Sequence, residues 1–284
     1  MAKVRVAPSL GFCEGVRRAF TLAERALEEE NSVFLLGELI HNRDAVELLL
    51  AKGARIALSP EDIPQGATVV TRSHGTPKSL MEDLLKRSKK VVDTTCPKVK
   101  RVQVLAQQLE AEGYRIVLFG ERSHPEVQAL LSYLKGEISV VSSEAEWQRV
   151  FEGVSPFPVA VLAQTTFPSA IFKEFEDWVE REALSWVRIV PTLCGETEVR
   201  QRELEKAIEE NPEDVVIVVG GKHSANTRSL FLLASRKGAQ VFWVENRGEL
   251  ESLSLPSGKS FFVVSGTSTP DSIVAEVVAY LREL

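Results

Sequence analysis

Residues Val91–Pro97 read V-V-D-T-T-C-P: an apolar run, three polar residues, a cysteine and a proline. Proline suits the first turn of a helix, so the stretch predicts a strand that turns through a cysteine corner into a helix. The chain contains this corner two more times, in Val4–Gly15 around Cys13 and in Arg188–Gly195 around Cys194. All three cysteines of the chain therefore occupy the same kind of position.

A fixed spacing extends each copy. A helical stretch and a strand lead from each cysteine, after 24, 24 and 26 residues, to a glycine, namely Gly37, Gly120 and Gly220. A polar residue follows each glycine four positions later, namely His41, His124 and Ser224. A second polar loop ending in proline comes before each of the second and third cysteines and near the C-terminus, at Pro77, Pro168 and Pro270. Periodicity of this kind indicates three copies of one structural unit.

Strands alternate with helices throughout, which predicts an α/β fold with mostly parallel sheets covered by helices. We expect three units at residues 14–96, 97–194 and 195–284. The last unit is one strand short, so the N-terminal strand within residues 1–13 should pair into it and close a ring. Functional loops gather at the carboxyl ends of parallel strands, so each unit should deliver its cysteine and polar loop to a shared centre.

The composition is that of an ordinary globular protein, with 44% hydrophobic and 26% charged residues in 284. The net charge of −6 argues against a nucleic-acid surface. No run reaches the roughly 18 apolar residues of a membrane span, and the start M-A-K-V-R-V lacks a signal core. Three distant cysteines do not form a disulfide framework, so we expect a reducing cytoplasm.

Three cysteines that each precede a helix suit metal binding, because the helix N-terminus favours a thiolate. Soft thiolates suit zinc or an iron–sulfur cluster. The absence of C-x-x-C pairs makes structural zinc the weaker option. A cubane iron–sulfur cluster normally has four cysteine ligands, so a cluster held by only three would leave one iron open. The plain alternative is three ordinary buried cysteines.

Hydrogen-bond donors crowd the predicted loop layer. They suit a phosphate or diphosphate, held by donors and helix N-termini with few cations. Metal ligation is another possibility, although no H-E-x-x-H pattern occurs. Exposed or internally bonded side chains are the plain alternative. The donors are His41, His74, His124, Thr165, Thr166, Ser224, Asn226, Thr267 and Ser268.

Glu126 is an exception among these residues. Two positions after the aligned polar residue, the three copies have Arg43, Glu126 and Asn226. A carboxylate repels an anionic ligand, so Glu126 should be protonated or should transfer a proton. Alternatively, it only favours the start of the following helix.

The motifs jointly resemble the 4-hydroxy-3-methylbut-2-enyl diphosphate reductase family, from residue 4 to about residue 275. The matching pieces are G-F-C-x-G-V at Cys13, H-N at His41, S-H-G at His74, D-T-T-C-P at Cys96, H-P-E-V at His124, A-Q-T-T at Thr165, C-x-x-T-x-x-R-Q from Cys194, G-G-K-x-S-x-N at Ser224 and S-G-x-S-x-P at Ser268.

The resemblance implies a trefoil of three α/β domains around a [4Fe–4S] cluster with three cysteine ligands and one open iron. The implied cluster ligands are Cys13, Cys96 and Cys194. Glu126 would deliver protons and Thr165 would position the substrate hydroxyl. The implied diphosphate-binding residues are His41, His74, His124, Ser224, Ala225, Asn226 and Ser268, while Thr166 and Thr197 would line the pocket.

The implied reaction is reductive dehydroxylation of an allylic diphosphate to isopentenyl and dimethylallyl diphosphate, with electrons from a ferredoxin or flavodoxin. Two alternatives are a quinolinate synthase-like [4Fe–4S] lyase and a non-enzymatic iron–sulfur sensor, for which no partner module is visible. The chain departs from the family at Ala225, where many members have serine, and at Glu14, where alanine is usual.

Overall fold

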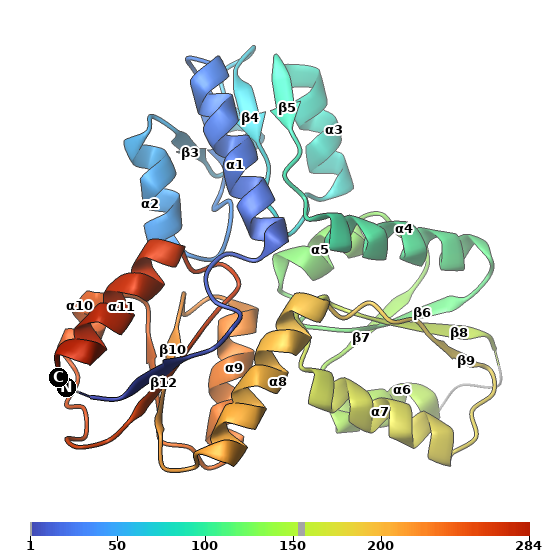
Figure 1. Cartoon of the computed structure of the whole chain (residues 1–284). Coiled ribbons are helices and arrows are strands. Elements are labelled where there is room, and N and C mark those ends of the chain that lie inside the picture. The colour runs from blue at the N-terminus through green and yellow to red at the C-terminus, as the bar shows by residue number, and fades with distance from the viewer. Residues whose placement is uncertain (1, 153–156) are drawn as a thin grey trace. The chain divides into compact units, whose positions relative to one another are not determined.

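The computed structural model describes residues 2–152 and 157–284 (Figure 1). These form two compact units. The first contains Met1–Thr21, Glu38–Gly53 and Gly195–Leu284, and the second contains Leu22–Gly37 and Ala54–Cys194. Helix α1 (Glu14–Glu29) contributes its first half to one unit and its second half to the other.

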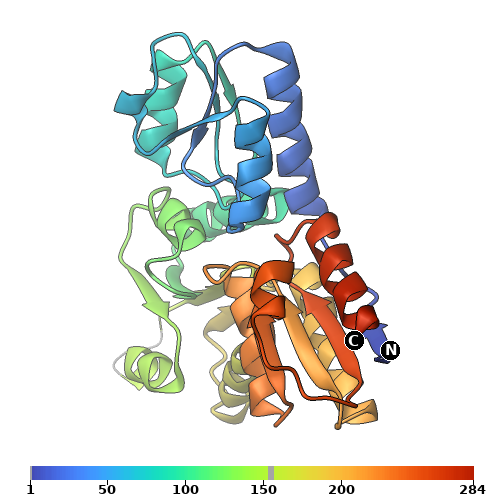
Figure 2. The same cartoon turned by 90° about the vertical axis from the view of Figure 1, so that its left-hand side faces the viewer.

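The first unit is built on one parallel sheet whose edge comes from the N-terminus. Its strands lie in the order β1 (Val4–Val6), β12 (Phe261–Ser265), β10 (Val215–Val219) and β11 (Val241–Val244). Val4 of β1 pairs with Phe261 of β12 in parallel register. Figure 2 shows β1 beside the C-terminal helix α11 (Asp271–Glu283). The N-terminal strand therefore completes the last sheet, as the strand count predicted.

Helices cover both faces of this sheet because successive strand residues point to opposite sides. Val216 and Val218 pack against α8 (Gly195–Glu210) and α9 (Ala225–Arg236). Val215, Ile217 and Val219 pack against α10 (Arg247–Glu251) and α11. Helix α2 (Arg43–Ala51) also belongs to this unit. All five residues of β10 and of β12 are buried, which is why these strands read as continuous apolar runs.

The second unit contains two further parallel sheets. One has the order β5 (Lys90–Val92), β4 (Thr68–Val70), β2 (Val33–Leu36) and β3 (Arg55–Ala57). The other has the order β9 (Val187–Ile189), β8 (Val159–Ala163), β6 (Arg115–Phe119) and β7 (Ile138–Val141).

The helices of the second unit pack on these sheets through apolar side chains. Helix α3 (Lys78–Arg87) packs on the first sheet through Leu84. Helices α4 (Pro97–Ala111) and α5 (Pro125–Leu131) cover one face of the second sheet. Helices α6 (Glu144–Glu152) and α7 (Ser169–Arg181) cover its other face (Figure 1). An aromatic cluster fills that interface around Phe119 and Phe175, whose ring centroids are 4.7 Å apart.

The three sheets share one strand order: the strand that leads to a cysteine, the strand before the proline-ended loop, the strand before the G-x-x-x-polar loop, and an edge strand. This repetition confirms the predicted α/β class. The sequence pattern predicts a helix over Arg228–Lys237, but α9 begins three residues earlier, at Ala225. The Ser224 hydroxyl accepts from the Thr227 N–H and caps the helix there. The sequence interpretation missed α10 and the short 3₁₀ helix Pro60–Asp62.

No helix in the described part of the chain is long and apolar enough to cross a membrane.

Candidate functional site

Each cysteine loop is bonded to the neighbouring proline-ended loop in the same way. The backbone N–H of Cys13 donates to the Thr267 carbonyl at 3.0 Å. The N–H of Cys96 donates to Ser73 at 2.9 Å, and that of Cys194 donates to Thr165 at 2.8 Å. In all three copies the accepting residue directly precedes a predicted ligand-binding residue, namely Ser268, His74 and Thr166. The fold therefore places a cysteine beside a predicted ligand-binding loop in each copy.

The three cysteines are half-buried and directly precede α1, α4 and α8. We expected the helix N-terminus to favour a thiolate. At Cys96 the N–H groups of Lys98 and Val99 do act in that direction, but burial outweighs them and raises the pKa of the thiol. The charges of Cys194 and Glu126 raise it further. Cys194 and Glu126 are therefore near enough to Cys96 in the second unit to act on it electrostatically.

Glu126 is the buried acid of the second unit, and only 4% of its surface is exposed. Burial raises its pKa to about 7, against two hydrogen bonds that favour the anion. Thr165 donates both of them, from its backbone N–H at 2.7 Å and from its hydroxyl at 2.8 Å. A carboxyl group with such a pKa exchanges protons near neutral pH.

His124 caps helix α5, which carries Glu126. The Nδ1 atom of His124 accepts from the Glu126 N–H at 3.2 Å, so the imidazole proton resides on Nε2 in the neutral ring. The His74 and His124 rings meet edge to face, with centroids 5.7 Å apart. Both predicted histidines of the second unit therefore lie together beside the buried acid.

Thr166 is held by Gln164, a residue that the sequence interpretation did not single out. The Gln164 amide donates to the Thr166 hydroxyl at 2.9 Å, and its oxygen accepts from the Glu121 N–H at 3.1 Å. Gln164 thus joins the two polar loops of this copy. The signal available in the sequence was its position in A-Q-T-T.

The first unit brings together the other predicted ligand-binding residues. The Ser268 hydroxyl lies 3.3 Å from the His41 carbonyl and donates to it. Ser224 caps α9, and its oxygen accepts from the Thr227 N–H at 3.3 Å. Asn226 is 2% exposed, yet neither atom of its amide has a hydrogen-bond partner among the residues that the structure describes. Buried amides normally have partners, so this amide is a candidate contact for a polar ligand.

Glycines let these loops approach closely. A Cβ atom on Gly221 would lie 2.4 Å from the His41 carbonyl oxygen, and one on Gly266 would lie 2.1 Å from the Thr227 hydroxyl. The two departures from the resembled family do not interrupt this packing. Glu14 is exposed and Ala225 is half-buried.

The predicted site residues divide between the two units. The first contains Cys13, His41, Ser224, Ala225, Asn226 and Ser268, and the second contains His74, Cys96, His124, Glu126, Thr165, Thr166 and Cys194. Among the described residues, no three His, Cys, Asp or Glu side chains are already arranged as a metal site. The three-cysteine centre remains a prediction.

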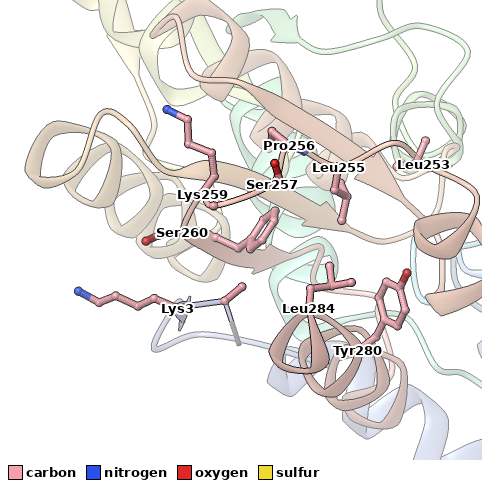
Figure 3. A pocket seen from close by; sticks show the side chains of 12 residues that line it. Lys3, Leu253, Leu255, Pro256, Ser257, Lys259, Ser260, Tyr280 and Leu284 are labelled. Atoms are coloured by element: carbon pink, nitrogen blue, oxygen red, sulfur yellow. The ribbon is translucent and has the colours of Figure 1, made fainter.

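A pocket of about 540 Å³ opens at the opposite, amino-terminal end of the first unit's sheet (Figure 3). It lies where Lys3 enters β1 and Ser260 enters β12. Figure 3 shows Leu255, Leu284 and Tyr280 lining it. None of the predicted site residues lines this pocket, so we do not assign it to the function.

The fold and the loops define a class: a three-copy α/β protein with a cysteine corner in each copy and a buried carboxyl group that exchanges protons near neutral pH. The sequence model of one family, described as LytB protein, matches residues 4–282. The chain belongs to this family.

Relatives match over nearly their whole length. Proteins named 4-hydroxy-3-methylbut-2-enyl diphosphate reductase from Aquifex aeolicus and Dictyoglomus turgidum are 36% and 34% identical to this chain. The alignments cover 100% and 99% of this chain, respectively, and 97% of each relative.

Solved structures agree with these matches. One is the structure of (E)-4-hydroxy-3-methyl-but-2-enyl diphosphate reductase, described as the terminal enzyme of the non-mevalonate pathway. It is 37% identical to this chain, has a TM-score of 0.70, and the match covers 100% of both chains. The reductase structure from Plasmodium falciparum has a TM-score of 0.87 at 23% identity, covering 98% of this chain and 87% of that one, and supports the fold alone.

Proposed function

We propose that this chain reduces 4-hydroxy-3-methylbut-2-enyl diphosphate to isopentenyl diphosphate and dimethylallyl diphosphate, the final step of the methylerythritol phosphate pathway. The C–O bond to the hydroxyl group breaks, two electrons and two protons enter, and water leaves. The observation that carries this proposal is the buried carboxyl group of Glu126, whose pKa is about 7. Thr165 donates hydrogen bonds to this group and also accepts one from the backbone N–H of Cys194.

Glu126 supplies the proton in this proposal. Its pKa of about 7 leaves a large protonated fraction at neutral pH. Protonation of the leaving hydroxyl converts it into water, which is a far better leaving group than hydroxide. Thr165 directs the carboxyl group through two hydrogen bonds. Its hydroxyl oxygen keeps an acceptor lone pair for the substrate hydroxyl.

The diphosphate would bind to neutral donors rather than to a lysine or arginine clamp. In the first unit these are the Asn226 amide, the Ser224 and Ser268 hydroxyls, His41, and the Ala225 N–H at the start of the 12-residue helix α9. A helix N-terminus stabilises a phosphate through its free N–H groups and its dipole. In the second unit we assign His74 and His124 to the same anion, since Nδ1 of His124 is already used and leaves Nε2–H as the donor.

We infer that Cys13, Cys96 and Cys194 hold a [4Fe–4S] cluster with one open iron. The donor set fits, because three thiols precede three helices and thiolates are the ligands of such clusters. When bound, the cluster would supply the electrons one at a time and a Lewis acid for the substrate oxygen. Metal ligation would offset the raised pKa of Cys96, because a metal ion stabilises the thiolate.

The family match favours this reductase over the quinolinate synthase-like lyase. We further infer that a ferredoxin or flavodoxin donates the electrons and that the cytoplasm keeps the thiols reduced. The three sheets with their helices would be three domains at residues 14–96, 97–194 and 195–284, the last completed by residues 1–13. Residues 1 and 153–156 lie outside the described part of these domains.

Anaerobic purification followed by iron, sulfide and activity measurements tests the proposal. We expect about four irons and four sulfides per chain, and consumption of the hydroxylated diphosphate only when a reductant is added. Cys96→Ser should lose the cluster and the activity together. Turnover without net consumption of reductant would contradict the proposed reaction.

A further inference from the structure

Arg200 is a buried cation that the proposed chemistry does not use. It lies on α8 with 2% of its surface exposed. Its Nη1 donates to the Ser265 carbonyl at 2.7 Å and lies 3.1 Å from the Ser265 hydroxyl. Its Nη2 donates to the Gly11 carbonyl at 2.8 Å. One guanidinium therefore joins the segment before Cys13 to the loop that contains Ser268.

The neighbouring contacts belong to the same junction. The Gly11 N–H donates to the Ser265 hydroxyl at 2.9 Å, and the Cys13 N–H donates to the Thr267 carbonyl at 3.0 Å. A second residue of α8, Glu203, accepts from the N–H and hydroxyl of Ser9 at 3.0 and 2.8 Å. Helix α8 thus fixes the cysteine segment at two points, and the Arg200 contacts also reach the second loop.

The charge of Arg200 has no carboxylate hydrogen-bonded to it among the described residues. Its partners are two carbonyls and a hydroxyl, and its Nε has no acceptor there. A buried charge is costly unless an opposite charge compensates it. Burial accordingly lowers the pKa of the guanidinium, while Cys13 and the more distant carboxylates of Glu196, Glu203 and Asp271 act in the opposite direction. An apolar side chain such as leucine or methionine would avoid this cost if the residue only filled space.

We propose that Arg200 is a positioning residue that holds the Cys13 segment against the Ser268 loop, and that its charge is compensated by the anionic groups these loops bind. This inference rests on the proposed function, which assigns a thiolate-bound cluster to Cys13 and a diphosphate to Ser268. It adds a cation in a site whose other donors are neutral.

The test compares Arg200→Met and Arg200→Lys with Arg5→Met in the cluster-loaded protein. Arg5 is the control because it is a partly buried arginine of the same sheet whose Nε donates to Asp214 at 3.0 Å, away from both loops. The readouts are the melting temperature, the iron content, the reduction potential of the cluster and the dissociation constant of inorganic pyrophosphate.

We expect Arg200→Met to weaken pyrophosphate binding by about tenfold or more, because the loop that contains Ser268 loses its charge-assisted hydrogen bonds to Arg200. The reduction potential should become more negative, because a cation near the cluster favours the reduced form. Arg200→Lys should retain the potential and lose part of the affinity. Arg5→Met should lower the melting temperature and leave the iron content, the reduction potential and the pyrophosphate affinity unchanged.

Unchanged affinity and potential in folded Arg200→Met would overturn the inference, leaving Arg200 a structural residue like Arg5. If Arg200→Met does not fold, Arg200→Lys and Ser265→Ala are compared with the parent in the same way. Parental pyrophosphate affinity in both variants would then overturn the inference. A parent protein that binds neither iron nor pyrophosphate would instead refute the proposed function itself.

Discussion

The backbone N–H of Cys194 donates to the carbonyl of Thr165 at 2.8 Å, and the N–H and hydroxyl of Thr165 hold the Glu126 carboxyl group at 2.7 and 2.8 Å. One residue thus fixes a cysteine loop and a proton-exchanging acid relative to each other. A shift of the loop between β8 and α7 would therefore move both the Glu126 carboxyl group and the Cys194 loop.

Glu126→Gln should abolish turnover, by at least about a hundredfold, because an amide cannot deliver the proton. Iron content should stay at the parental level, since Glu126 is not a proposed ligand. Glu137→Gln, at an exposed position of the same repeat, is the matched control and should behave like the parent. Substantial activity in Glu126→Gln would remove this residue from the mechanism.

The stability of the protein should depend on pH through Glu126. Its pKa rises from 4.5 to about 7 on folding, so the native state binds more protons between these values. The free energy of unfolding therefore falls as pH rises from about 5 to about 7, by on the order of 3 kcal/mol at most. Denaturant titrations of the parent and Glu126→Gln at several pH values measure this, and equal slopes against pH would contradict it.

Activity should fall as pH rises through about 7, because the protonated form of Glu126 is the proposed proton donor. Thr165→Val removes a hydrogen bond that lowers the pKa of Glu126, so this pKa should increase. The descending limb of the rate profile should then move to higher pH, and the maximal rate should drop about tenfold through poorer positioning. Thr165→Ser, which keeps the hydroxyl, should restore the parental profile.

Gly221→Ala should disturb the diphosphate loops of the first unit. The new Cβ would lie 2.4 Å from the His41 carbonyl, so one backbone must move. We expect KM for the diphosphate to rise more than kcat falls. Gly248→Ala in α10, whose Cβ would meet only the Asn246 side chain at 3.4 Å, is the control, and its kinetics should be parental.

Asn226→Ala should separate binding from stability. The Asn226 amide is buried without a partner among the described residues, so its removal should leave the unfolding free energy unchanged or raise it by about 1 kcal/mol. Pyrophosphate binding should weaken by about tenfold. A large loss of stability without loss of affinity would show that the amide serves the fold instead.

The repeat was readable from the sequence because its signals are local. A strand that is buried on both faces reads as an apolar run, as Val215–Val219 does, and a cysteine before a helix leaves a polar corner. Helix starts were less accurate. The helix after Ser224 starts three residues before Arg228, the first residue that apolar periodicity predicts. A side-chain cap sets its first residue instead.

The sequence by itself determined the three-copy α/β organisation and the candidate residues, since spacing and residue type depend only on chain order. Tertiary structure decided how these residues act. Burial raises the pKa of Glu126 to about 7 and also raises the pKa of Cys96. Both residues lie at helix N-termini, which by themselves would favour the anion. The tertiary fold also brings Arg200 into contact with Gly11, which is 189 residues away in the sequence. Desolvation and long-range hydrogen bonds depend on which segments pack together, and no local pattern encodes that.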